Sequence, residues 1–364
     1  MIKDSRNYGV DLLRIVSMLG VVTLHILGHG GLLDNAGSFF EFSALYFLQT
    51  LVQPAVDCFI LISGYVGYKK GRYYPRLKNI ISLFFVVLFY SISITLVSKL
   101  IFPDSVSTID IIKACMPIIS QQYWFFTSYV GLFILSPLLN VAVHHADKKQ
   151  MLIFTIVLAI CCCFSRIKDP FAFDGGFSVI WLALLYLLGA LMKKHDLANA
   201  LSKKAWALIT TSFLVLTWTS KIAFSYIPIS FVNEHSSILL SNTSPTVVIM
   251  ACSSLCLFSK TNCKETLGVL INFFSASAFS IYLIHDNIFI RTFIISRASD
   301  TIGNYHPALT VLFVLCGAIL VSFYCILIDN IRILLFRFVR INKLSENIEI
   351  FIKRIINKLY FKLN

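Results

Sequence analysis

The sequence predicts an all-α integral membrane protein, a single bundle of about ten transmembrane helices with both termini in the cytoplasm. Of its 364 residues, 57% are hydrophobic and 13% are charged, whereas soluble chains carry roughly a quarter charged residues. Its apolar stretches repeatedly approach the ~20 residues that a helix needs to cross hydrocarbon. These stretches are continuously apolar rather than alternating, which favours helices over a transmembrane barrel.

The hydrophobic stretches divide the chain into ten expected spans. The second span contains Pro54, Ser63 and Gly64, any of which could bend its helix. The longest outer loops, 102–122 and 226–243, are too short to fold alone, so no separate soluble domain is expected. The expected spans are 8–28, 42–68, 77–101, 123–143, 150–165, 177–193, 205–225, 244–259, 272–295 and 307–331.

The positive charge follows the expected topology. With the N-terminus placed in the cytoplasm, 24 of the 31 Lys and Arg residues fall on the inner side of the membrane. This positive-inside bias predicts an even number of spans in the inner (cytoplasmic) cell membrane. The formal charge of +13 is therefore a topology signal, and no nucleic-acid partner is expected.

The chain after residue 331 has a different character. Apolar residues recur there at helical spacing with Lys and Arg between them, which predicts a basic amphipathic helix on the anionic inner leaflet. The expected division is a membrane domain over 1–331 and this helix over 332–364, with membrane lipids as its partners. A role in binding another protein is the alternative. The apolar positions are Ile341, Leu344, Ile348, Phe351, Ile355 and Leu359.

Three ionisable residues lie on one face of the first span. Arg14 and His25 are eleven residues apart, about three helical turns and roughly 16 Å along the axis, and Asp11 is within reach of an ion pair with Arg14. Ionisable groups inside a span usually turn toward a bundle interior or a watery cavity. Imidazole suits general-base work near neutral pH, and the guanidinium fork suits phosphate. The alternatives are structural roles. Arg14 would then extend its side chain to the membrane surface, and His25 would be hydrogen-bonded to a neighbouring carbonyl.

No metal site is predicted. His29 lies one turn beyond His25 and would make an i, i+4 pair, but the sequence offers no third ligand beside it. Most of the ten cysteines lie inside spans, where a thiol behaves as a small hydrophobe. Only Cys115 clearly lies in an outer loop, so no external disulfide pair is expected.

Four segments resemble, in order, the motifs of the membrane acyltransferase-3 family. Arg14 to His25 (RIVSMLGVVTLH) is similar to its basic-residue-then-His signature, and Val56 to Tyr65 (VDCFILISGY) to its second-span motif. Tyr123 to Asn140 (YWFFTSYVGLFILSPLLN) resembles its Trp-Phe segment, and FSIYLIH, ending at His285, its late Tyr-Leu-Ile-His stretch.

The resemblance implies a ten-helix O-acyltransferase of the stand-alone type. Such an enzyme moves an acyl group, usually acetyl, from cytoplasmic acetyl-CoA to an extracytoplasmic acceptor, often a hydroxyl of a glycan or lipid-linked glycan. His25 would be the catalytic imidazole, and Arg14 would belong to the donor-binding set. Acetyl-CoA is then a substrate, and no permanently bound cofactor is expected.

The first inner loop carries cations that would grip the phosphates of CoA: Lys69, Arg72 and Arg76. Here the chain departs from the family, in which Arg-x-x-Arg is frequent, because three residues separate Arg72 from Arg76. Solvated positive-inside residues are the alternative interpretation of each of these cations.

Other polar residues are expected to support catalysis or to line the acceptor side: Asp57, Ser63, Trp124, Tyr282 and His285. Asp57 could orient an imidazole or pair with Arg14, and Ser63 is a candidate for stabilising an oxyanion. The alternatives are interhelical hydrogen bonds for Tyr282 and His285, expected mid-way along the ninth span, and an aromatic belt for Trp124. The rival function is a transporter or flippase for a glycan or lipid, with His25, Asp57 and Asp286 relaying protons.

Overall fold

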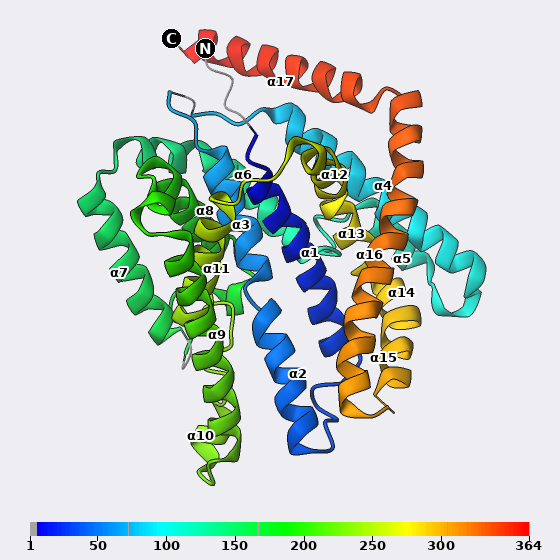
Figure 1. Ribbon diagram of the computed structural model, residues 1–364. Helices are drawn as coiled ribbons and strands as arrows, with labels where there is room; N and C mark the ends of the chain where they lie inside the picture. The colour runs from blue at the N-terminus through cyan, green and yellow to red at the C-terminus, as the bar shows by residue number, and fades with distance from the viewer. Residues whose placement is uncertain (1–5, 72, 166–167, 304, 364) are drawn as a thin grey trace.

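The computed structural model describes residues 6–71, 73–165, 168–303 and 305–363, and every regular element in these ranges is a helix (Figure 1). The α-helices are α1 Tyr8–His29, α2 Phe39–Val52, α3 Ala55–Gly67, α4 Leu77–Ile101, α5 Thr108–Cys115, α6 Trp124–His145, α7 Lys148–Phe164, α8 Val179–Lys194, α9 Lys203–Tyr226, α10 Ser230–Glu234, α11 Pro245–Ser259, α12 Glu265–Ala276, α13 Ala278–His285, α14 Ile288–Ile290, α15 Ser296–Ile302, α16 Pro307–Phe338 and α17 Ile341–Leu363. Short 3₁₀ helices lie at η1 Pro103–Ser105, η2 Asp174–Gly176 and η3 Leu197–Ala200, and η4 Arg291–Ile295 is a π-helical turn.

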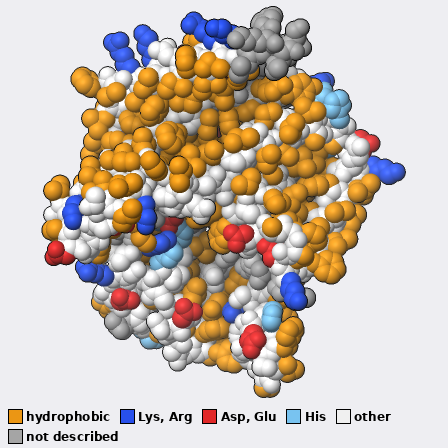
Figure 2. All heavy atoms as spheres, turned by 180° about the vertical axis from the view of Figure 1, so that it is seen from behind, with side chains coloured by type: hydrophobic (Ala, Val, Ile, Leu, Met, Phe, Trp, Pro, Cys, Tyr) orange, Lys and Arg blue, Asp and Glu red, His pale blue; other side chains and the backbone are white. Residues whose placement is uncertain are grey.

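The protein is a multi-pass membrane protein. Among the described residues, seven helices are long and apolar enough to span a bilayer, and a wide hydrophobic surface covers the face seen in Figure 2. Three more expected spans correspond to α7, α8 and α11, which are shorter, at 17, 16 and 15 residues. The total of ten spans therefore stays a prediction. The seven candidates are Tyr8–His29, Phe39–Gly67, Leu77–Ile101, Trp124–His145, Lys203–Tyr226, Glu265–His285 and Leu309–Phe338.

Two expected spans are interrupted. The second breaks at Gln53 and Pro54 into α2 and α3, which confirms the bend expected at Pro54. Ser63 and Gly64 cause no break, because α3 continues through both to Gly67. The Gly64 position instead allows close packing: a Cβ there would lie 2.0 Å from the backbone oxygen of Tyr186 on α8.

The expected ninth span, 272–295, is wrong as a continuous helix. Its helix ends at His285, so His285 and Asp286 lie at a helix terminus and not mid-way along a span. Asn287 then has an extended ψ of 134°, and its side-chain oxygen accepts a hydrogen bond from the backbone N–H of Phe289. The helix stops here because its polar residues bond across the bundle: Asn287 donates to the Tyr123 hydroxyl at 2.9 Å.

Helix α1 runs through the middle of the bundle. It packs on α3, α11, α12, α13 and α16, and its Val22 and Leu27 are fully buried. This position brings side chains of α1 against segments that come much later in the chain. Arg14 and His25 on α1 therefore lie within the bundle and are only partly exposed, as expected for ionisable residues of this span.

Helix α17 lies across one end of the bundle, the end at which α1 begins (Figure 1). It packs on α4, with Glu346 paired to Lys78 at 3.0 Å. The amphipathic helix starts at Ile341 rather than 332, because α16 continues as far as Phe338. The boundary between a membrane domain and a surface helix, and the side of the membrane on which this end lies, stay predictions.

Candidate active site

Two adjoining cavities lead into the bundle from the end near α17. The basic cavity, of about 470 Å³, is lined by the cations Arg14, Lys69 and Arg76 among other residues. The histidine cavity, of about 330 Å³, contains His25 and a largely aromatic wall. Both cavities share a waist of four lining residues, which are Arg14, Ser63, Leu83 and Tyr129. A molecule held in the basic cavity therefore has a path past Arg14 toward His25.

Arg14 lies at the waist with its charge partly balanced. Its Nη1 is 2.6 Å from Asp11 Oδ1, which confirms the expected ion pair, and Arg6 binds the other oxygen of Asp11 at 2.5 Å. Asp11 is buried, whereas 27% of the Arg14 side chain is exposed. One carboxylate is thus shared by two guanidinium groups, which leaves net positive charge facing the basic cavity.

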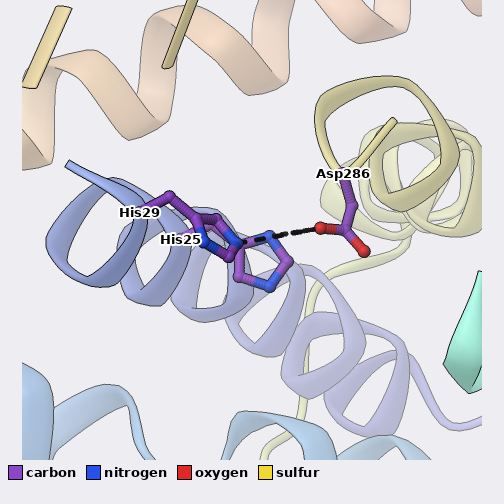
Figure 3. A group of neighbouring side chains, drawn as sticks. All are labelled: His25, His29 and Asp286. Carbon is purple, nitrogen blue, oxygen red and sulfur yellow. Dashed lines mark ion pairs between the residues drawn. The ribbon is translucent and has the colours of Figure 1, made fainter. Parts of the chain in front are cut away.

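His25 lies beside the polar helix end after α13. Its Nδ1 is 3.0 Å from His285 Nε2 and 3.4 Å from Asp286 Oδ1. Asp286 Oδ1 also lies 3.5 Å from Arg291 and 3.9 Å from His29 Nε2. Figure 3 shows His25 and His29 on one helix, with the Asp286 carboxylate turned toward them. The sequence suggested His285 and Asp286 either as helpers to His25 or as an acceptor-side patch, and the fold places both directly beside His25.

Hydrogen bonding fixes the tautomers of the two imidazoles. His285 is fully buried, and its Nδ1 lies 2.6 Å from the backbone oxygen of Ile281. A carbonyl only accepts, so this Nδ1 carries a hydrogen, and Nε2 of neutral His285 is an acceptor. His25 must then donate from Nδ1, which leaves the Nε2 of His25 unprotonated. The ring that lines the histidine cavity therefore offers a basic nitrogen to a substrate.

Three of the other expected site residues line the histidine cavity. Ser63 lies at the waist, where its Oγ donates to the backbone oxygen of Phe59 at 2.9 Å. Trp124 lines the wall and packs edge-to-face on Phe177 at a ring distance of 4.5 Å. Tyr282 is buried one turn before His285, and it also lines the cavity.

Asp57 lies apart from this group. It is fully buried and accepts a hydrogen bond from Trp181 Nε1 at 3.1 Å, and its Oδ2 has no hydrogen-bond partner among the described residues. The structure therefore pairs it with neither His25 nor Arg14, the two possibilities raised from the sequence. Arg72, expected to bind the donor, lies outside the described residues.

Sequence reasoning missed several polar residues of the two cavities. Tyr129 lies at the waist, and Asn140 and Tyr186, which are hydrogen-bonded to each other at 2.9 Å, line the basic cavity. Asn140 is the last residue of the third motif, so the motif was recognised in the sequence but no role was assigned to Asn140. Arg291 lines neither cavity but lies beside Asp286 on a short π-helical turn, and no sequence signal indicated this position.

A comparison with known families identifies the chain. The family model described as an acyltransferase domain (Acyl_transf_3) matches residues 7–327, which is most of the chain. The protein belongs to this acyltransferase family. The match covers α1 through most of α16 and confirms the resemblance found in the four motifs. No curated protein and no solved structure matches this acyltransferase significantly.

Proposed function

We propose that this acyltransferase moves an acetyl group from cytoplasmic acetyl-CoA to a hydroxyl of an extracytoplasmic glycan or lipid-linked glycan. The observation that carries the proposal is the pair of adjoining cavities, which connects a cluster of cations to a basic imidazole. Phosphate groups of the donor bind Arg14, Lys69 and Arg76, because these cations are the charge complement of the donor. The chain acts in the inner membrane with the basic cavity open to the cytoplasm.

The distance between the two ends suits a donor with a long arm. Arg14 and His25 are separated by about 16 Å along α1, since eleven residues rise ~1.5 Å each. A donor whose phosphates bind at the waist and in the basic cavity can extend its pantetheine arm through the histidine cavity. Its thioester then lies near His25, away from most of the bulk water.

His25 acts as general base on the acceptor. Its Nε2 removes the proton of the acceptor hydroxyl while that oxygen attacks the thioester carbonyl. His285 and Asp286 hold the ring through Nδ1, and the carboxylate stabilises the imidazolium that forms. Collapse of the tetrahedral intermediate releases CoA, whose thiolate takes the proton back from His25. Ser63 and Tyr129 at the waist are polar side chains along the path of the donor arm.

A covalent route uses the same residues. In it, Nε2 of His25 attacks the thioester first, and an acetyl-imidazole then passes the acetyl group to the acceptor. A burst of acetyl-enzyme in the absence of acceptor distinguishes this route from direct transfer.

The proposal is tested by mass spectrometry of surface glycans from cells with and without the protein. We expect the mass increment of one acetyl group to appear with the wild-type chain and to be lost with His25→Ala. Equal membrane expression of the variant is the control. Acetylation that persists with His25→Ala contradicts the proposed role of His25. Loss of the glycan itself from the surface, with unchanged acetylation, contradicts the enzyme and favours the flippase.

A further inference from the structure

His25, His29 and Asp286 bring three metal-binding atoms together at the end of the histidine cavity. One nitrogen or oxygen of each lies within 4.8 Å of the others, and His25 Nδ1 is 3.4 Å from Asp286 Oδ1. The sequence argument against a metal depended on the lack of a third ligand beside His25 and His29. The break after α13 supplies that third ligand, Asp286, from a distant part of the chain.

We propose that these three residues bind a zinc ion or a similar transition-metal dication, and that the bound ion inhibits acyl transfer. Imidazole and carboxylate are ligands that zinc prefers, and ligand atoms around a tetrahedral zinc lie about 3.3 Å apart for bonds of ~2.0–2.1 Å. The pair formed by His25 and Asp286 already has this spacing, and the His29 side chain, 34% exposed, has room to approach. Water completes the coordination.

Zinc and the base compete for the same ring. A metal on His25 Nδ1 displaces the hydrogen bond to His285 and needs the Nδ1 lone pair. The proton of neutral His25 then moves from Nδ1 to Nε2, with no change in the total number of bound protons. Nε2 becomes a donor and can no longer take a proton from a hydroxyl. The metal also takes Asp286 from Arg291, which lies 3.5 Å from the same carboxylate oxygen.

The inhibitory effect depends on the proposed function, but binding of the metal does not. Binding is therefore measured first, by equilibrium dialysis of zinc against the purified full-length chain in detergent micelles. The matched variants are His29→Gln, which removes one ligand outside the proposed catalytic machinery, and His145→Gln, which removes an exposed histidine elsewhere. Replacement of zinc by cobalt gives visible absorption bands that report on coordination.

We expect one zinc site in the wild type, affinity at least about tenfold weaker in His29→Gln, and no change in His145→Gln. Basal acyl transfer stays the same in both variants, and the zinc concentration that halves the activity rises in His29→Gln by the same factor as the loss of affinity. Unchanged zinc binding in His29→Gln overturns the site. Binding that depends on His29, in a chain that transfers no acyl group even after chelation, leaves the site standing and contradicts the proposed function instead.

Discussion

In the proposed mechanism His285 acts through His25, because it lines neither the basic cavity nor the histidine cavity. It is fully buried, donates from Nδ1 to Ile281 and accepts from His25 Nδ1. This chain of two bonds holds His25 in the one neutral tautomer that has a basic Nε2. Its proposed role is therefore a positioning role, like that of the carboxylate in a catalytic triad.

Replacing His285 separates a positioning role from a merely structural one. We expect His285→Phe, which has no acceptor, to lower kcat by about 10²-fold or more while the KM for acetyl-CoA stays the same. His285→Gln keeps a carbonyl acceptor and restores most of kcat. Steady-state kinetics with varied acetyl-CoA provide the measurement. A wild-type kcat in the Phe variant, or a change confined to KM, contradicts this role.

At the scale of the helices, α3 and α8 pack closely beside the proposed site. Gly64 on α3 approaches Tyr186, and Gly189 on α8 approaches Leu61, with added Cβ atoms 2.0 and 2.2 Å from backbone oxygens. Small residues let helices approach in this way in membranes. Ser63, next to Gly64, and Tyr186 both line the basic cavity, so this packing also sets the width of the cavity.

We expect Gly64→Ala to destabilise the bundle by about 1–3 kcal/mol, because the new methyl group overlaps backbone rather than a movable side chain. The measurement is the apparent unfolding temperature in detergent. Gly28→Ala on α1 is the matched control, since nothing lies within 4 Å of the added carbon there. If both variants unfold at the wild-type temperature, the close packing of α3 on α8 carries no such energy.

The helices also show how far the sequence could predict the structure. Hydropathy predicted the position of α1, and the spacing of Arg14 and His25 predicted which face of α1 turns toward the cavities. Both could be predicted because they are local properties of one helix. Pro54 likewise predicted the break between α2 and α3. The end of α13 could not be foreseen, since it depends on the pairing of Asn287 with Tyr123 and of His285 with His25, residues that are distant in sequence. The same long-range pairing made His29 and Asp286 neighbours, which no local spacing reveals.

For the whole molecule, the essential feature is that the two cavities meet at the waist formed by their four shared residues. Leu83 of α4 is the apolar member of this waist, which it forms with Arg14, Ser63 and Tyr129. The donor phosphates and the reacting thioester lie on opposite sides of it in the proposed mechanism. Blocking the waist therefore separates donor binding from catalysis without touching a charged residue.

We expect Leu83→Trp to lower acetyl transfer by about tenfold or more, because a bulky ring keeps the thioester from its reactive position near His25. Leu96→Trp, at a 44% exposed position on the same helix, should retain wild-type transfer. Turnover of acetyl-CoA by each purified variant is the measurement. Equal turnover in both variants would show that the donor takes another route.

The partners of His25 lie far along the chain, and His285 comes 260 residues after it. During synthesis, α1 therefore enters the membrane long before His285 and Asp286 have been translated. A nascent or truncated chain has the imidazole but lacks the groups that orient it. In the proposed mechanism such an intermediate lacks an oriented imidazole, so acyl transfer starts only when the bundle is complete.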